Sequence, residues 1–304
     1  MSQGALPGFR DFYPQELAER SYIMNAWRTV VRRYAFVEYD GPPLEPLELY
    51  TRKSGEEIVG QLYAFTDKGG REVSLRPEMT PTFARMVAAR ANALRKPVRW
   101  FSMPQLFRYE RQQKGRLREH FQLNVDIVGE PDVTADAELL AVGIDVLREL
   151  GLGTEDVEAR VSDRRILHGY LLVLGVPEAS VPGVYAVVDK LERQPREVSD
   201  EKLAALGVPD RAREAILGLA SVGLDRIREA LRDRPEGRHA EDFARYLDYL
   251  GALGVAEFVR FDLSIVRGLA YYTGIVFELF DRKGEFRAIC GGGRYDALLA
   301  ALGG

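Results

Sequence analysis

The feature of this sequence that most constrains its fold is a long helical stretch set between two regions of strand pattern. From about Arg165 to Gly251 strand signals disappear and helical segments dominate. Before and after this stretch, alternating apolar and polar residues predict antiparallel strands. Such an order is typical of an α+β fold that carries a helical insertion. We therefore predict two parts of one core, residues 1–164 and 252–304, and a helical insertion domain, residues 165–251.

The strand patterns before the insertion predict two hairpins. The segment LYAFTDKGGREVSLRPE alternates apolar and polar residues around Asp67-Lys68-Gly69-Gly70, which has the chemistry of a turn. A second strand–loop–strand is predicted from Val98 to Arg111 and from Phe121 to Gly129. Helices are predicted over Gln15–Tyr34, Thr80–Leu94 and Ala135–Leu150, and later strands over Glu257–Phe280 and from a turn at 281–284 to Cys290.

The composition is that of a soluble globular protein. Of the 304 residues, 46% are hydrophobic and 29% are charged, with a net charge of -4. No apolar run approaches the roughly 18 residues that span a bilayer, and no signal peptide is evident. Cys290, which we expect to be buried, is the single cysteine, so no internal disulfide can form, and the three histidines lack metal-ligand spacing. We expect a cytoplasmic protein without membrane contact and without a structural metal.

Positive charge is concentrated on the loop of the second hairpin. The fifteen residues from Arg108 to Gln122, RYERQQKGRLREHFQ, contain five cations and two carboxylates. This loop is longer and more basic than a hairpin needs. Guanidinium groups offer paired donors to phosphate, whereas the glycine-rich motifs GxxxxGK[ST] and strand–GxGxxG–helix are absent. If the chain binds a nucleotide, arginines on a sheet hold its phosphates.

The strands beside this loop carry polar residues on one face. Alternation places Arg108 and Glu110 together on the first strand, and Gln122 and Asp126 together on the returning strand. The simplest interpretation is the solvated outer face of a hairpin. The residue types and the basic loop favour the alternative, a face that recognises a ligand.

Five ordered motifs resemble those of histidyl-tRNA synthetase, a class II aminoacyl-tRNA synthetase. FRYERQQKGRLREHFQ is similar to the second class signature, and YDGPPLEP to the first. SLRPEMTP resembles the amino-acid-binding strand, and VRGLAYYTGIVFE and GGGRYD resemble two signatures peculiar to the histidyl enzyme. The resemblance implies an antiparallel sheet flanked by helices. It also implies histidine, ATP with its Mg²⁺, tRNA(His) and a second copy of the chain as partners, with Pro43 near the dimer interface.

For ATP, the resemblance implies roles for one glutamate and three arginines. Arg108 would contact the α-phosphate, Glu110 the adenine side, and Arg116 the outer phosphates, although Arg116 could instead be a solvated loop cation. Arg267 would be the catalytic cation, in the place where related enzymes hold a metal ion. Arg108 and Arg267 would favour the anionic transition state as the histidine carboxylate attacks. No side chain needs to act as nucleophile or base.

For the backbone groups of the substrate histidine, the resemblance implies three residues. Glu78 would accept the ammonium group and Thr80 would assist it, while Gln122 would hold the carboxylate or its activated form. The alternative for Glu78 is a surface glutamate of a strand, which could cap the start of the following helix.

For the imidazole ring, the resemblance implies three more residues. Asp126 would accept a ring N–H and so discriminate against rings that lack it, although many bacterial relatives carry glutamate here. Tyr272 and Tyr295 would complete the ring pocket. The alternative for each tyrosine is a half-buried position in the core.

Two departures from the family pattern leave the function open. Ala270 stands where many histidyl enzymes have aspartate, and the third class signature and the anticodon-binding domain do not follow ALLAALGG. One interpretation is a ligase catalytic domain, with less than full activity in the shortened chain. The other is a regulatory subunit of ATP phosphoribosyltransferase, which senses histidine without charging tRNA. The retained arginines and glutamate favour the ligase over this regulator, and over a scaffold without a ligand.

Overall fold

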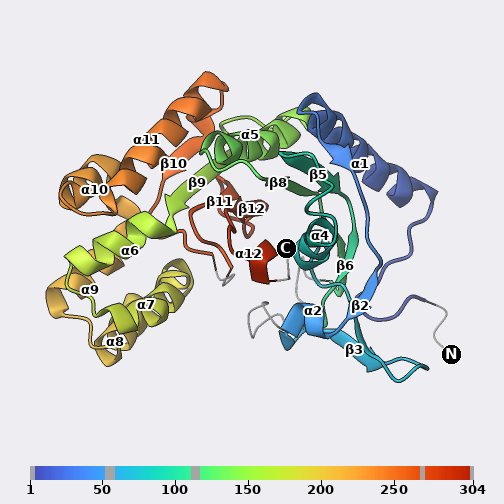
Figure 1. Cartoon of the computed structure of the whole chain (residues 1–304), viewed down its shortest axis with the longest axis horizontal. Helices are drawn as coiled ribbons and strands as arrows, with labels where there is room; N and C mark the ends of the chain where they lie inside the picture. Colours follow the sequence, from blue (N-terminus) through green and yellow to red (C-terminus); the bar gives the residue numbers. More distant parts are fainter. Residues whose placement is uncertain (1–3, 52–58, 111–116, 268–270, 302–304) are drawn as a thin grey trace. The chain divides into compact units, whose positions relative to one another are not determined.

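The computed structural model of the chain describes residues 4–51, 59–110, 117–267 and 271–301. The chain divides into two compact units, one of residues 1–130, 269–271 and 297–304, the other of residues 131–268 and 272–296. Each unit contains both helices and strands (Figure 1), in agreement with the predicted α+β class. The division into core and insertion at residues 164 and 252 stays a prediction.

The first unit contains three small sheets with the strand orders β1-β5-β8, β2-β4-β3 and β6-β7. Its described helices are α1 (Pro14–Arg33), α2 (Glu48–Thr51), α4 (Thr80–Ala88) and α12 (Leu298–Ala301). Its described strands are β1 (Val37–Glu38), β2 (Leu44–Pro46), β3 (Tyr63–Thr66), β4 (Glu72–Leu75), β5 (Val98–Ser102), β6 (Gln105–Phe107), β7 (Glu119–Phe121) and β8 (Asn124–Val128).

Local chemistry explains the first helix and the first hairpin, and both predictions are confirmed. Helix α1 begins at Pro14, where the missing backbone donor removes no hydrogen bond, and carries two arginines in its last turn. In the turn between β3 and β4, the Asp67 carboxylate accepts hydrogen bonds from the backbone N–H groups of Gly69 and Arg71, at 2.8 and 2.9 Å. Gly70 takes a φ of +79°, which glycine adopts without steric cost.

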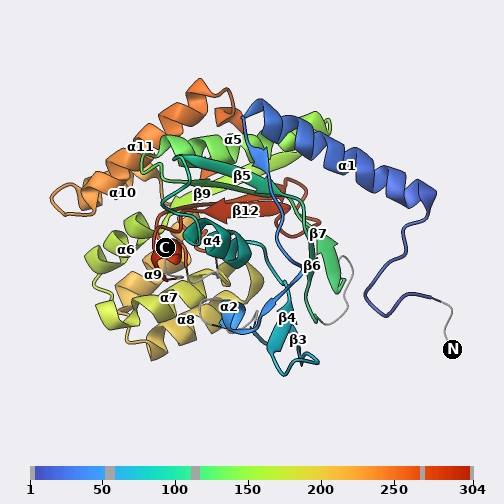
Figure 2. The same ribbon diagram turned by 45° about the vertical axis from the view of Figure 1, so that its right-hand side comes forward.

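Each strand of the second hairpin is divided in two. Strand β5 ends before Pro104 and β6 follows it, because proline has no N–H to give to a ladder. The Pro104 carbonyl instead accepts the backbone N–H of Gln122 at 3.2 Å, at the break between β7 and β8. Strands β6 and β7 pair antiparallel (Figure 2), and β5 pairs with β8 so that Trp100 lies opposite Asp126.

Helix α4 packs on β5, in the β1-β5-β8 sheet, and forms a hydrophobic core with it. Phe83 and Val87 of α4 pack with Val98 of β5, and Leu299 of α12 packs against the same cluster. Helix α12 lies beside α4 (Figure 1). The predicted helix over Thr80–Leu94 is too long, since α4 ends at Ala88 and is followed by turns.

The second unit contains one described sheet with the order β10-β9-β11-β12. Its strands are β9 (Val157–Asp163), β10 (Val259–Phe261), β11 (Ile275–Asp281) and β12 (Cys290–Gly293). Its α-helices are α5 (Thr134–Glu149), α6 (Arg164–Val173), α7 (Val181–Val188), α8 (Arg196–Ala205), α9 (Asp210–Leu217), α10 (Leu224–Leu231) and α11 (Gly237–Ala252). Short 3₁₀ turns lie at Glu178–Ser180, Leu191–Arg193, Leu219–Ser221 and Ala256–Phe258.

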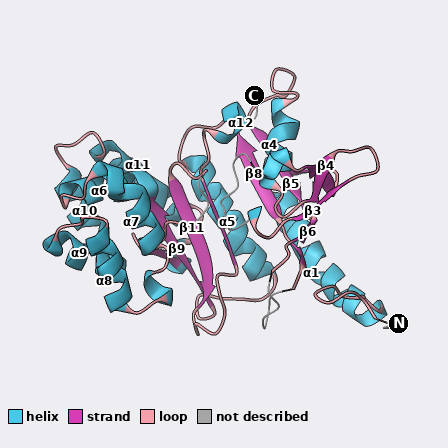
Figure 3. Cartoon of the chain, turned by 90° about the horizontal axis from the view of Figure 1, so that it is seen from below, coloured by secondary structure: helices cyan, strands magenta, loops and turns pink. Residues whose placement is uncertain are grey.

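In this sheet β9 and β11 pair antiparallel over their whole length (Figure 3), and α6 packs against both. All residues between β9 and β10 are described, and they form helices and turns without a strand. The sheets are not purely antiparallel, because β10 pairs parallel to β9, and β1 parallel to β5.

Two expectations for the last strand are wrong. Strand β12 begins at Cys290 instead of ending there, and the three glycines that follow belong to the strand. Cys290 is exposed. Among the described residues, no helix has both the length and the apolar character needed to cross a bilayer.

Candidate functional site

The predicted site residues fall into two sets, one in each unit. In the first unit, Glu78 lies just before α4 with 5% of its surface exposed, and its Oε2 accepts a hydrogen bond from the Tyr271 hydroxyl at 3.0 Å. The N-cap of α4 is Met79 and not Glu78, so the capping alternative is not supported. Thr80 is the first residue of α4 and is half-buried.

Arg108 is half-buried and is held by the same segment. Its Nε donates to the Pro77 carbonyl at 2.9 Å, and its backbone N–H donates to the Arg118 carbonyl at 3.0 Å. Glu110 follows, and its backbone N–H donates to the Arg108 carbonyl at 2.8 Å. Within the residues that the structure describes, no carboxylate pairs with Arg108. Its positive charge is therefore not neutralised there.

The polar face of β8 is buried, so the interpretation as a solvated hairpin surface is wrong. Asn124 is 8% exposed and Asp126 is 5% exposed. The half-buried Gln122 donates from Nε2 to Asn124 Oδ1 at 2.6 Å, which fixes the orientation of its amide group. Burial, reinforced by the carboxylates of Asp126 and Asp40, raises the pKa of the Tyr39 hydroxyl far above its ordinary range. A buried carboxylate on this face has the chemistry to accept a ligand N–H.

His120, on the neighbouring strand β7, is kept neutral. Burial and then the positive charge of Arg108 lower the pKa of His120 to about 4. Near neutral pH the His120 imidazole is therefore uncharged, and it places no second positive charge next to Arg108.

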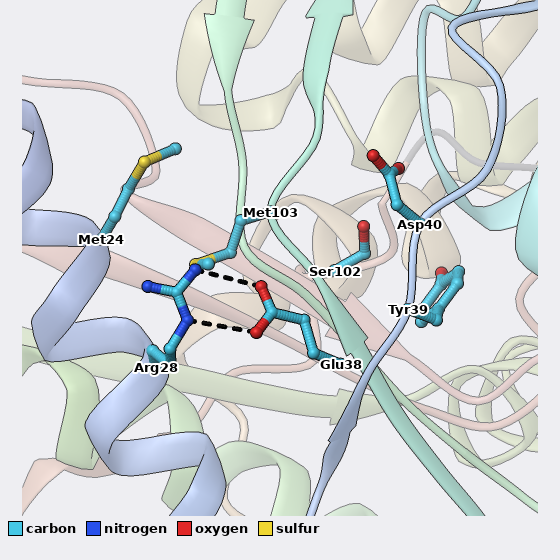
Figure 4. A pocket seen from close by; sticks show the side chains of 7 residues that line it. All are labelled: Met24, Arg28, Glu38, Tyr39, Asp40, Ser102 and Met103. Carbon is cyan, nitrogen blue, oxygen red and sulfur yellow. Dashed lines mark hydrogen bonds and ion pairs between the residues drawn. The ribbon is translucent and has the colours of Figure 1, made fainter.

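A pocket of about 410 Å³ lies between α1, β1 and the end of β5 (Figure 4). Its walls include the ion pair of Arg28 with Glu38, whose two hydrogen bonds measure 3.1 and 3.0 Å. The other lining residues are Met24, Tyr39, Asp40, Ser102 and Met103. None of the predicted substrate-binding residues that the structure describes lines this pocket.

In the second unit, Arg267 is held in an unusual backbone conformation. Its φ of +52° lies in the left-handed region, which costs a non-glycine residue roughly 1–3 kcal/mol. Its Nη1 lies 3.1 Å from Glu278 Oε1, and its Cζ lies 5.7 Å from the centre of the Tyr272 ring. Burial raises the pKa of Glu278, and the Arg267 charge opposes this rise. The Arg267 guanidinium is thus oriented by a carboxylate and an aromatic face.

The three glycines of β12 leave space for three side chains of the same unit. A Cβ on Gly291 would lie 1.6 Å from Arg267 Nη1, and a Cβ on Gly292 would lie 2.7 Å from the Phe277 ring. A Cβ on Gly293 would lie 2.8 Å from the Tyr272 ring. The protein's own side chains therefore approach this backbone closely.

Tyr272 and Tyr295 are both half-buried and are joined through their neighbours. The Thr273 N–H donates to the Arg294 carbonyl at 2.7 Å, and Thr273 Oγ1 lies 2.6 Å from Asp296 Oδ2. These bonds hold the segments of the two tyrosines side by side, although 23 residues separate the two tyrosines in the sequence.

The sequence interpretation missed three residues of these sets. Tyr271 contacts Glu78, although only its neighbour Tyr272 was predicted, and the Tyr-Tyr pair was the available signal. Glu278 closes the VRGLAYYTGIVFE motif and pairs with Arg267. Asn124 lies two residues from Gln122 on the polar face. Arg116 and Ala270 lie outside the described residues.

The chain is similar to known proteins of one family. The family model described as histidyl-tRNA synthetase matches residues 8–304. Histidine–tRNA ligase of Opitutus terrae is 47% identical over 305 residues, which cover 99% of this chain and 70% of that protein. The chloroplastic/mitochondrial histidine–tRNA ligase of Arabidopsis thaliana is 43% identical over 298 residues, covering 98% of this chain and 61% of that protein.

A solved structure from Bacillus halodurans, described as an ATP phosphoribosyltransferase regulatory subunit/histidyl-tRNA synthetase, has a similar fold. Its TM-score is 0.86 at 23% identity, over 99% of this chain and 78% of that chain, a likeness that concerns the fold alone. The family match and the 47% identical ligase extend over nearly all of the chain. The chain belongs to the histidyl-tRNA synthetase family.

Proposed function

We propose that this chain is the catalytic part of a histidine–tRNA ligase, which activates histidine with ATP and transfers it to tRNA(His). The observation that carries the proposal is Arg108, a half-buried cation that has no carboxylate partner among the described residues. Such a group is suited to bind a phosphate. Family membership gives that phosphate an identity, the α-phosphate of ATP.

The reaction proceeds in two steps. A carboxylate oxygen of histidine bonds to the α-phosphorus, and the bond to the bridging oxygen breaks to release pyrophosphate. A terminal ribose hydroxyl of the tRNA then attacks the carbonyl carbon and loses its proton as AMP leaves. Arg108 and Arg267 each contribute positive charge that favours the anionic transition state of the first step. Arg116 and Glu110 are assigned to the outer phosphates and the adenine.

Different side chains bind the ammonium group, the carboxylate and the ring of histidine. Glu78 accepts the ammonium group with Thr80 beside it, and its burial strengthens this interaction. Gln122 holds the carboxylate. Asp126 accepts a ring N–H, which its burial on β8 supports. Tyr272 and Tyr295 are assigned to the faces of the ring.

Mg²⁺ enters the proposal as the counter-ion of the ATP phosphates. In the described ranges, no three or more His, Cys, Asp and Glu side chains are grouped so that they could hold a metal. Mg²⁺ commonly binds through substrate phosphates and water with few protein ligands. We therefore propose that Mg²⁺ binds to the protein as a complex with ATP.

The proposal includes a homodimer in the cytoplasm. Large apolar side chains are exposed at the N-cap and along α1, on β1 and on β2. They are Tyr13, Leu17, Tyr22, Ile23, Val37 and Leu44. A concentration of exposed apolar groups on one part of a chain is typical of a protein–protein contact. A second copy, with Pro43 near the contact, is the occupant that family membership supports, and the helices from 165 to 251 are assigned to the tRNA acceptor stem.

The experiment that tests the function is histidine-dependent exchange of radiolabelled pyrophosphate into ATP. A ligase catalytic unit incorporates label only when histidine is present. A regulatory subunit that senses histidine would bind histidine in a calorimeter but incorporate no label. Absence of both signals would overturn the proposal.

A further inference from the structure

The strongest arrangement outside the predicted site is a buried ion pair in the second unit. Arg294 Nε lies 3.2 and 3.1 Å from the two carboxylate oxygens of Asp136, and its Nη2 lies 2.5 Å from Asp136 Oδ2. The same Nη2 donates to the Asp132 carbonyl at 3.0 Å. The two side chains are only 13% and 9% exposed. Arg294 is therefore fixed at several points to the start of α5.

The backbone of Arg294 in turn fixes both tyrosine segments. Its carbonyl accepts the Thr273 N–H at 2.7 Å, and its N–H donates to the Ile275 carbonyl at 2.9 Å. Thr273 follows Tyr272 directly, and Tyr295 follows Arg294 directly. A shift of Arg294 relative to α5 consequently moves both tyrosines.

A second ion pair lies against the same segment. Arg165 and Asp163 form a pair of 2.5 Å, and Asp163 is fully buried. A Cβ placed on Gly274 would lie 3.3 Å from the Arg294 side chain and 3.4 Å from that of Arg165. Gly274 therefore lies between two guanidinium groups, each neutralised by a carboxylate, and the backbone after Thr273 has little room to move.

Stability alone does not account for such a pair. Ion pairs that are removed from water commonly stabilise a fold no better than apolar residues of the same volume. A forked arginine–carboxylate pair does, however, fix geometry, because two parallel hydrogen bonds define both distance and angle. In this fold the geometry so defined is that of the tyrosine segments.

We propose that Arg294, held by Asp136, is a positioning residue that fixes Tyr272 and Tyr295 for the binding of histidine. This inference rests on the proposed function, since it takes histidine as the ligand of those tyrosines. Arg294 acts through the two tyrosines and not by touching the substrate.

The test compares Arg294→Lys and Asp136→Asn with the wild-type chain in pyrophosphate exchange. Each variant loses the fork, so the KM for histidine should rise roughly 10- to 100-fold, as small misplacements of binding groups do. The KM for ATP should change less than about threefold, since the phosphate-binding arginines are untouched. Asp136→Glu keeps the charge and should recover part of the histidine affinity.

The matched control is Arg85→Lys. Arg85 also donates to a buried carboxylate, with its Nε and Nη2 lying 3.2 and 2.6 Å from Glu45 Oε1, and neither residue belongs to the proposed site. This control likewise weakens an arginine–carboxylate pair, and we expect no change in the KM for histidine. If Arg294→Lys or Asp136→Asn fails to fold, the KM for histidine is measured on Asp136→Glu instead.

The outcomes separate the two claims. If the wild-type chain neither binds histidine nor catalyses exchange, the proposed function is wrong. An active wild type whose folded variants keep the histidine KM, or raise the histidine and ATP values equally, overturns the positioning role of Arg294.

Discussion

Arg267 and Gly291 approach so closely that no side chain fits between them. A Cβ on Gly291 would lie 1.6 Å from Arg267 Nη1 and 2.7 Å from the Phe277 carbonyl oxygen. The guanidinium therefore lies directly over bare backbone, where Glu278 holds it from one side at 3.1 Å. The position of the proposed catalytic cation depends on a residue that has no side chain at all.

Gly291→Ala should displace Arg267 and slow histidyl-adenylate formation. We expect the exchange rate to fall roughly 10- to 100-fold, because the charge moves away from the place where negative charge develops. Steady-state exchange at saturating histidine and ATP measures the effect. The control is Gly251→Ala in α11, where a Cβ meets nothing within 4 Å and alanine is the better helix former. If both variants exchange pyrophosphate at the wild-type rate, Arg267 is not the catalytic cation.

Tyr271→Phe should weaken histidine binding through Glu78. The Tyr271 hydroxyl donates to the buried Glu78 carboxylate at 3.0 Å, so its loss removes one of the bonds that orient that carboxylate. We expect a cost of about 0.5–1.5 kcal/mol in histidine binding, measured by calorimetry. Glu78→Gln removes the charge itself and should cost more. If Tyr271→Phe proves the more damaging of the two, Glu78 is not the ammonium acceptor.

Asp126→Asn should reduce discrimination for the imidazole ring. An amide keeps the shape of the buried side chain but offers only one acceptor oxygen, so histidine binding should lose about 1–3 kcal/mol. We choose asparagine over alanine because Asp126 is 5% exposed and a cavity would confuse the measurement. Unchanged histidine affinity in a folded variant would exclude Asp126 from the ring site.

His120 should make the fold less stable in mild acid. Its pKa in the folded chain is about 4, below the ordinary value near 6.5 of the unfolded chain. Above pH 6.5 both states are neutral and His120 has no effect. As the pH falls from 6.5 towards 4, His120 becomes protonated in the unfolded state but stays neutral in the folded state. The free energy of unfolding therefore declines by at most about 1.4 kcal/mol per pH unit. The partial exposure of the ring narrows the pH range over which stability declines.

His120→Gln removes this proton uptake. Urea unfolding at pH 7.0 and at pH 5.0 should therefore show a smaller loss of stability for the variant than for the wild type. Parallel losses in the two proteins would mean that His120 titrates alike in both states.

Sedimentation tests the proposed dimer. We expect the chain to sediment as a dimer at micromolar concentration, and Ile23→Asp on α1 to shift it towards monomer, because a carboxylate there loses its hydration at an apolar contact. Arg213→Ala on α9, which is not among the exposed apolar residues of α1, β1 and β2, serves as the control. A wild-type monomer at these concentrations would contradict the proposal.

Local sequence signals predicted the elements whose causes are local. The Asp67–Gly70 turn depends on bonds between residues two to four positions apart, and α1 begins at a proline, so both could be recognised from the residues alone. The break at Pro104 could also have been expected from its missing donor. By contrast, no local pattern relates Arg294 to Asp136, which lies 158 residues away, or Tyr271 to Glu78, which lies 193 residues away. Contacts of this range depend on the folded arrangement and escape periodicity and spacing.

The glycines of β12 also carry a cost in chain entropy. Glycine loses more conformational freedom on folding than any other residue, roughly 0.5–1 kcal/mol each relative to alanine. Three in succession, Gly291 to Gly293, therefore make β12 harder to order by about 1.5–3 kcal/mol than a strand of alanines. The side chains of Arg267, Phe277 and Tyr272, which occupy the space the glycines leave, must offset that cost through their packing. Strand β12 consequently becomes ordered together with the packing of those three side chains, and neither occurs without the other.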